Sequence, residues 1–355
     1  MFSKSTILFL LLCPFFAFAA KGDEEHKVVI VKEFNVGGNS SVNINSKYGK
    51  VTVYIWDKPV CKATITVTGF GKDQEQARRM TETIDVKAME SGNSVNITAS
   101  SNPGSRWFSN KKDNKDYVNI DIDVYVPSKL KAMNIDSNFG DVIARKLPFP
   151  SYLKVNYGFI DVAEAGNLFL SINYTNKARI GKTDVLTVQS NYSSLNCESA
   201  SEVNITSNYG NHSFGNVAEM KVQANYDEIK FKNVGSVVLR ANYTDVKMDG
   251  LGSSAIISAN YGDVRIRKID KNFKSLNADV NYTDIRLGVQ SGTPFRVRAE
   301  IRNGDFSADG FVFRHVSENR NKGNLSYSAI TSNAGEASPL ISVNGKHCDV
   351  KVGED

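Results

Sequence analysis

Cysteine, proline and histidine are all scarce in this chain of 355 residues, which has four, eight and four of them. Four cysteines are too few for a disulfide-rich scaffold, and eight prolines exclude a proline-rich linker protein. The net charge of +5, from 43 basic and 38 acidic residues, is too small to indicate a protein that binds nucleic acid. Hydrophobic residues make up 41% of the chain, so it can bury a core and is not a disordered protein.

Motifs of known catalytic chemistry are also missing. The sequence contains no HExxH, no GxSxG and no paired CxxC motif, and its histidines are isolated. Gly181-Lys182-Thr183 is similar to the end of a phosphate-binding loop, but Asn176 stands where that loop needs a glycine. We therefore predict no catalytic residues, no metal ligands, no cofactor and no enzymatic activity.

Long apolar runs are limited to the N-terminal segment Met1–Ala20. Lys4 is followed by an apolar run from Ile7 to Phe16 and then by Ala17-Phe18-Ala19, an order typical of a secretory signal peptide. No later stretch approaches the ~20 apolar residues that a membrane helix needs. We expect an exported protein without a membrane span, located in the periplasm, on the cell surface or in the medium.

Removal of the signal peptide would leave Cys61, Cys197 and Cys348. An odd number of thiols cannot all pair within the chain. We favour buried free thiols, and a Cys61–Cys348 disulfide remains the alternative.

A short repeat dominates the rest of the chain. An aromatic residue recurs at roughly every 17th or 18th position, with a longer last step from Tyr261 to Tyr282, and asparagine precedes each one. The aromatics are Phe139, Tyr157, Tyr174, Tyr192, Tyr209, Tyr226, Tyr243, Tyr261 and Tyr282. Apolar residues stand four positions before each aromatic and, in most repeats, three and five positions after it, as Val222, Ile229 and Phe231 do around Tyr226. This period of two predicts two short strands per repeat, joined at a corner.

A single coil of this length cannot bury its own apolar face, so successive coils must stack. The predicted fold is all-β: a right-handed parallel β-helix, or β-solenoid, with rungs ~4.8 Å apart. We place the regular solenoid at 131–305, after a β-rich region at 21–130 with a first rung near 44–53. Residues 306–355 would form degenerate rungs and a C-terminal cap. Asn303-Gly304-Asp305, at the end of the regular solenoid, and Val343-Asn344-Gly345 have the form of degenerate rungs without the tyrosine.

The insertion between the first two rungs should contain strands at Ala63–Thr68, Ser94–Ala99 and Tyr117–Val126. It should also contain one helix, which begins after Asp73 and carries Ala77, Met80 and Ile84 on one face. We expect these elements to cover the end of the solenoid, which would otherwise be an edge open to aggregation.

Three columns of side chains follow from the stacking. The asparagines can form a ladder of amide hydrogen bonds, which we interpret as structural. The tyrosines should pack inside the corner; the alternative is an outward aromatic strip that stacks on sugar rings. Two and four positions after the aromatics, acidic and basic residues such as Glu228 and Lys230 should form a face of salt bridges rather than a cation site.

The pattern apolar-x-small-Asn-Tyr-Gly-Asp-Val, as in Asn260-Tyr261-Gly262-Asp263-Val264, resembles the bacterial putative-adhesin family of β-solenoid envelope proteins. The Tyr48-Gly49-Lys50-Val51 rung, the strand-helix-strand insertion and Tyr125-Val126-Pro127 are also similar to that family. The resemblance implies an envelope protein of adhesin type and supplies no catalytic residues. The tyrosine departs from the smaller residue that the family has at the corner.

The sequence therefore predicts an exported, non-enzymatic binding protein whose partner is an extended glycan or an envelope protein. A carbohydrate-active enzyme or carbohydrate-binding module on the same scaffold is the first alternative, and a protein-binding scaffold or sensor is the second. The candidate binding residues are Trp107, Phe108, Tyr226, Tyr243, Tyr261 and Tyr282.

Overall fold

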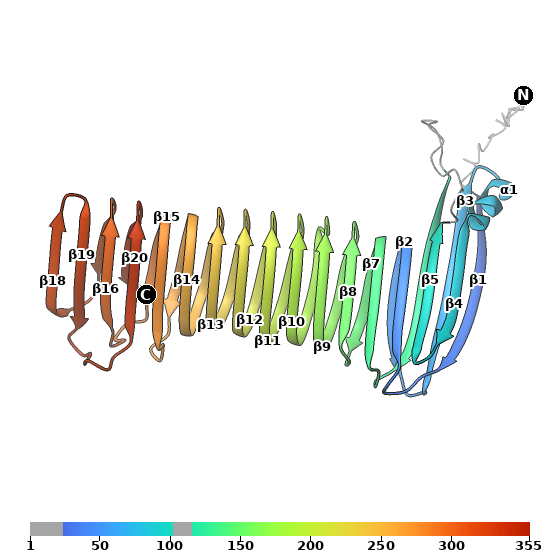
Figure 1. The fold of residues 1–355 in the computed structure, drawn as a ribbon, viewed down its shortest axis with the longest axis horizontal. Helices are drawn as coiled ribbons and strands as arrows, with labels where there is room; N and C mark the ends of the chain where they lie inside the picture. Colours follow the sequence, from blue (N-terminus) through green and yellow to red (C-terminus); the bar gives the residue numbers. More distant parts are fainter. Residues whose placement is uncertain (1–23, 102–115) are drawn as a thin grey trace, which may run out of the picture.

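The computed structural model describes residues 24–101 and 116–355 and has the predicted fold, a parallel β-solenoid. Its strands stand side by side along one elongated body, with the N-terminal region at one end (Figure 1). The signal peptide predicted at 1–20 and the candidate binding residues Trp107 and Phe108 lie outside the described residues.

The middle of the molecule consists of coils that each form one bent strand. Five consecutive strands have the same length: β9 (Phe159–Asn173), β10 (Lys177–Asn191), β11 (Ser194–Asn208), β12 (Asn211–Asn225) and β13 (Glu228–Asn242). They continue into β14 (Asp245–Ile269) and β15 (Ser275–Val289). Each strand pairs in parallel with the next in the predicted register.

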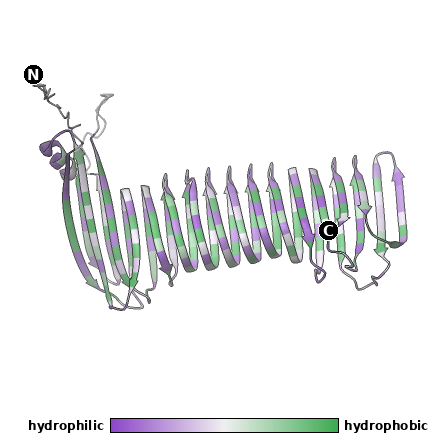
Figure 2. Ribbon diagram, turned by 180° about the vertical axis from the view of Figure 1, so that it is seen from behind, coloured by the Kyte–Doolittle hydropathy of each residue, from purple (hydrophilic) through white to green (hydrophobic). Residues whose placement is uncertain are grey.

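The core follows from the period of two. Ile229 and Val246 face each other on adjacent rungs, as do Leu239 and Ile257, and all four side chains are buried. Figure 2 shows the alternation as hydrophobic and hydrophilic bands along the strands. Apolar side chains from the two halves of each coil therefore meet inside the solenoid, and polar ones point outward.

The first rung is β2 (Ser41–Trp56), which pairs with β7 (Ala132–Leu147). The solenoid then continues through β8 (Ser151–Asn156), which pairs with β7 and β9. On its other side β2 pairs in parallel with β5 (Ser94–Ser101) and β6 (Tyr117–Pro127). The outermost strands are antiparallel: β1 (Glu24–Asn35), β3 (Val60–Gly71) and β4 (Ile84–Ser91).

The predicted helix is α1 (Gln74–Glu82), which lies beside β1 and β3 in Figure 1. Asp73 caps it as predicted, because its carboxylate accepts the N–H of Gln76 at 2.8 Å. Ala77 is buried, and the helix packs so closely on β3 that a Cβ at Gly69 would lie 2.2 Å from the Ala77 carbonyl oxygen. Ile84 is not on the helix as predicted, since the helix ends at Glu82 and Ile84 begins β4.

At the other end the chain order and the rung order differ. After β15 come β16 (Arg296–Arg302) and β17 (Asp305–Asp309), and then the antiparallel hairpin of β18 (Phe313–Asn321) and β19 (Asn324–Thr331). The chain then returns with β20 (Leu340–Lys346) and β21 (Asp349–Glu354), which pair with β15 on one side and with β16 and β17 on the other. The C-terminal rung is thus inserted between two earlier ones.

This insertion corrects the predicted position of the last corner. Asn303 is a corner with a φ of 54°, as expected, but the C-terminal rung turns at His347 and not at Asn344. Asn344 instead lies on β20 opposite Asp279.

The three cysteines of the described chain are free and buried. Cys61 lies in β3 at one end of the molecule and Cys348 follows β20 at the other, so the alternative disulfide does not form (Figure 1).

Candidate functional site: an exposed aromatic column

The corner aromatics have a backbone conformation that is rare for bulky residues. Tyr48 and the nine repeat aromatics all have positive φ, between 49° and 63°. For a residue other than glycine this left-handed conformation costs roughly 1–2 kcal/mol. The backbone hydrogen bond of the corner offsets part of this cost. Tyr157 N donates to the carbonyl oxygen of Asn173 at 3.1 Å, and the corners from Tyr174 to Tyr243 repeat the bond.

The conformation directs the rings outward. From Phe139 to Tyr282, each of the nine repeat aromatics is 43% to 52% exposed. The prediction that the tyrosines pack in the core is therefore wrong. Along an extended strand, side chains alternate between the core and the solvent. A residue with a left-handed φ breaks this alternation, so the ring points to solvent instead of into the core.

The rings form one continuous stack. Adjacent centroids from Tyr48 to Tyr282 are 4.7 to 5.7 Å apart, and adjacent ring planes differ by 1° to 19°. The imidazole of His347 adds an eleventh ring, 4.6 Å from that of Tyr282. At ~4.8 Å per rung the aromatic column, meaning these eleven rings, is roughly 50 Å long.

The asparagine ladder next to the column is confirmed. Nδ2 of each asparagine donates to Oδ1 of the asparagine one rung earlier, with distances of 2.8 to 3.1 Å from Asn138 to Asn260. The ladder ends at Asn260. Asn281 lies opposite it on the next rung, and its buried Oδ1 has no hydrogen-bond partner. The ladder holds the bases of the rings from Phe139 to Tyr261 in register with their neighbours.

The residue after each aromatic lies at the inside of the corner and is either a polar residue or a glycine. Where it has a polar side chain, that side chain can accept a neighbouring backbone N–H, as Ser193 Oγ accepts from Thr175 N at 3.0 Å. Where it is glycine, the adjacent backbone comes closer: a Cβ at Gly158 would lie 2.0 Å from the Gly140 carbonyl oxygen.

One corner contains a buried polar cluster that the sequence analysis missed. Ser207 Oγ lies 2.6 Å from His212 Nε2 and donates to Asp227 Oδ1 at 3.0 Å. Burial lowers the pKa of His212 to about 4 and raises the pKa of Asp227. These residues are separated along the sequence and meet only across adjacent rungs, so no motif could have indicated them. All three are buried, and a ligand in solvent cannot reach them.

The predicted face of acidic and basic residues is present on the strand that follows the corner. Glu228 lies opposite Asp245, and Lys230 lies opposite Lys247. The Glu228 carboxylate is 3.0 Å from the Lys247 ammonium and 3.1 Å from that of Lys230, which confirms salt bridging there. Within residues 24–101 and 116–355, no group of three or more potential ligands is arranged to hold a metal ion.

Of the predicted binding residues, Tyr226, Tyr243, Tyr261 and Tyr282 lie on consecutive rungs of the aromatic column. Their centroids are 4.7 to 5.0 Å apart, and their rings differ by 3° to 4° in orientation. The structure thus joins these four into one surface with six further aromatics and His347, which sequence reasoning had not included as site residues.

Several solved structures are similar to this chain. A "putative adhesin" of Parabacteroides distasonis is 12% identical, with 91% of this chain and 97% of that one covered and a TM-score of 0.31. A "putative adhesin" of Parabacteroides merdae is 10% identical, with 91% and 95% covered and a TM-score of 0.31. A "putative cell adhesion protein" of Clostridium sporogenes is 11% identical, with 94% and 100% covered and a TM-score of 0.21.

No curated protein matches the chain. None of the helices in the described residues is long and apolar enough to cross a membrane. The family model described as Toastrack DUF4097 matches residues 39–353, which include every rung of the solenoid. The chain therefore belongs to the Toastrack DUF4097 family.

Proposed function

We propose that this protein is an exported, adhesin-like binding protein of a bacterial envelope, and that it holds an extended glycan along the aromatic column without cleaving it. The observation that carries the proposal is the exposure of a long stack of aromatic rings. Because each ring is stacked between its neighbours, the column presents a continuous strip of ring edges and tyrosine hydroxyls to solvent. Such a strip offers a sugar chain both apolar contact and hydrogen bonds.

The aromatic rings are not needed for the turn itself. Asn303 makes the same left-handed corner, with a φ of 54°, and carries no ring. Asparagine and glycine adopt this conformation more readily than tyrosine does. Asparagine would fit these corners with less strain than tyrosine. That exposed tyrosines stand there instead indicates that the rings have a function at the surface.

The length of the column supports an extended ligand. Each ring offers the same chemistry as the next, at strand spacing and with nearly parallel planes. Contacts that are weak singly add up when one ligand engages many of them at once. A polysaccharide strand can do this, whereas a small metabolite would contact only two or three rings.

Export rests on the N-terminal segment Met1–Ala20. Its charged start, apolar middle and small residues before Lys21 are typical of a signal peptide. An envelope location would give the column access to long glycans, and protease accessibility on intact cells distinguishes surface display from the periplasm.

The test uses the purified mature chain with Tyr226→Asn and Tyr243→Asn combined. Asparagine keeps the left-handed corner and removes the ring, so folding should be retained. Wild type should be retained on immobilised polysaccharides and the double variant much less. The control is Tyr54→Thr, which removes an exposed tyrosine stacked on Tyr125 outside the column.

Two results would contradict the proposal. Equal retention of wild type and the double variant would exclude the column as the binding surface. Release of shortened sugar products, abolished by changing one acidic residue, would show a carbohydrate-active enzyme instead.

A further inference from the structure

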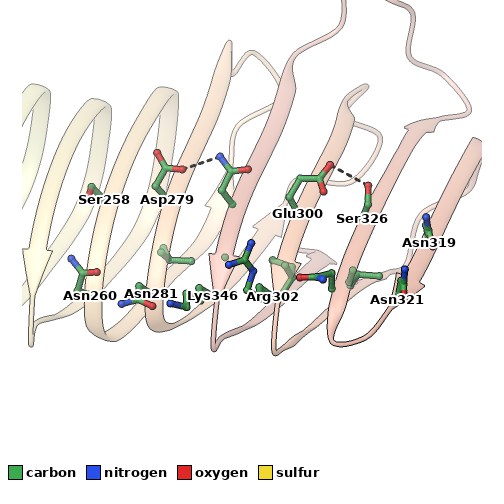
Figure 3. Close-up of a pocket in the computed structure, with 16 residues that line it drawn as sticks. Ser258, Asn260, Asp279, Asn281, Glu300, Arg302, Asn319, Asn321, Ser326 and Lys346 are labelled. Carbon is green, nitrogen blue, oxygen red and sulfur yellow. Dashed lines mark hydrogen bonds between the residues drawn. The ribbon is translucent and has the colours of Figure 1, made fainter.

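A cleft of about 560 Å³ lies beside the C-terminal end of the aromatic column. It extends over β14, β15, β20, β16, β19 and β18, and its lining side chains point into it from these strands (Figure 3). The cleft exists because the inserted C-terminal rung brings distant parts of the sequence side by side.

One row of the cleft continues the asparagine ladder with different residues. In the order of the rungs it contains Asn260, Asn281, Lys346, Arg302, Asn324 and Asn321. Lys346 and Arg302 are paired across β20 and β16, and both are exposed. Two cations thus stand next to each other with amides on both sides.

Neither cation has a carboxylate to neutralise it. In the described part of the chain neither forms an ion pair, and the acidic residues of the cleft have other partners. Asp279 accepts from Nδ2 of Asn344 at 2.9 Å. Glu300 accepts from Ser326 Oγ at 3.1 Å and lies 3.5 Å from the guanidinium of Arg298. Like charges side by side on paired strands are unfavourable unless an anion joins them.

The cations also adjoin the aromatic column. His347 follows Lys346 directly, stacks on Tyr282, and donates its backbone N–H to the carbonyl oxygen of Arg302 at 2.8 Å. The cleft and the column are therefore parts of one surface. It offers ring edges with tyrosine hydroxyls, amide groups and two positive charges that form no ion pair in the described residues.

We propose that Lys346 and Arg302 bind carboxylates of an acidic polysaccharide that lies along the aromatic column. The inference rests on the proposed function and names its ligand class. The ring edges and tyrosine hydroxyls of the column would contact the sugar units, the amides would hydrogen-bond to sugar hydroxyls, and the cations would pair with carboxylates. An anionic protein would use the cations but has no comparable need for the stacked rings.

The test compares polygalacturonate with the same polymer after methyl esterification, which removes its charge and keeps its sugar backbone. Wild type should bind the acid form about tenfold more tightly or better at low salt, since a charge-assisted hydrogen bond contributes that much. Lys346→Gln with Arg302→Gln should remove this preference, so that the variant binds the acid and the ester with equal affinity. Lys232→Gln with Arg179→Gln, which removes two exposed cations elsewhere, should keep the preference.

The failures can be distinguished. If wild type binds the ester as tightly as the acid, the inference is wrong and the proposed function stands. If neither polymer binds while another immobilised polysaccharide retains wild type, the inference is wrong and the proposed function stands; if no polysaccharide retains wild type, both are wrong. If poly-L-glutamate binds as tightly as polygalacturonate and the Lys346/Arg302 variant loses both, the ligand is an acidic protein and the sugar assignment is overturned. Thermal melts of each variant confirm that it is folded.

Discussion

His212 Nε2 lies 2.6 Å from Ser207 Oγ inside the solenoid, and the Nδ1 atom of the same ring is buried without a hydrogen-bond partner. Because the hydroxyl of Ser207 donates to Asp227, Nε2 carries the imidazole proton and Nδ1 carries none. His212 stands in the inward column where its neighbours are Leu195 and Ile229, so a neutral imidazole replaces an aliphatic side chain.

The first prediction is a loss of stability in mild acid. His212 has a pKa of about 4 in the fold and 6.5 in the unfolded chain, so the unfolded chain binds the proton first as the pH falls. The free energy of unfolding should therefore decrease by about 3 kcal/mol as the pH falls from 6.5 to 4 because of this group. Burial raises the pKa of Asp227, so the folded chain binds that proton before the unfolded chain does. This contribution increases the free energy of unfolding as the pH falls and opposes the effect of His212.

The variant His212→Leu isolates this effect. Leucine matches the adjacent rungs, and Ser207 keeps its bond to Asp227. Denaturant unfolding at pH 7, 6, 5 and 4 should show a flatter pH dependence for the variant than for wild type. Parallel curves would show that His212 does not titrate as described.

The second prediction concerns the register of the core. Val246→Asp places a carboxylate at a fully buried position opposite Ile229 and should cost more than about 3 kcal/mol. Lys247→Ser removes an exposed side chain that pairs with Glu228 and should cost less than about 1 kcal/mol. Thermal melts measure both, and equal losses would contradict the assigned inward and outward faces.

The third prediction concerns the asparagine ladder. Asn208→Ala removes two side-chain hydrogen bonds, one to Asn191 and one from Asn225, both 3.1 Å long. At ~1 kcal/mol per bond the unfolding free energy should fall by about 2 kcal/mol. Asn196→Ala, on an outward position of the same rung, is the control and should have little effect. A ladder without energetic importance would make the two variants alike.

The fourth prediction concerns the inserted rung. A chain that ends at Ser338 lacks β20 and β21, and with them the buried side chains Ile341, Val343, Val350 and Val352. Since each rung of a solenoid contacts only its neighbours, the damage should remain at this end. Limited proteolysis should produce new cleavage after Gln290 and leave the rungs from β9 to β13 protected. As a control, a chain that lacks only the last three residues, 353–355, should give the same cleavage pattern as wild type. If the chain that ends at Ser338 resists cleavage after Gln290, the pairing of β20 with both β15 and β16 is wrong.

Much of this architecture can be derived from the sequence, because its physics is local or periodic. Alternation of apolar and polar residues defines which side of a strand is buried, and the Asn-aromatic pairs define the register. Val246 and Ile229 could be paired, and the asparagine ladder anticipated, by counting residues. The cap at Asp73 depends only on its own side chain and the N–H of Gln76, three positions later.

Other features exist only in the tertiary structure. Tyr226 and its equivalents point outward because a left-handed φ at the corner breaks the alternation, and a count by two cannot detect that change. Ser207, His212 and Asp227 meet because stacking places successive rungs one strand spacing apart. Lys346 and Arg302 become neighbours because the last rung enters between two earlier ones, a choice of strand pairing that sequence periodicity leaves open. The sequence by itself therefore determined the coil and its register, whereas the backbone turn at the corner and the order of the last rungs decided which surface the protein presents.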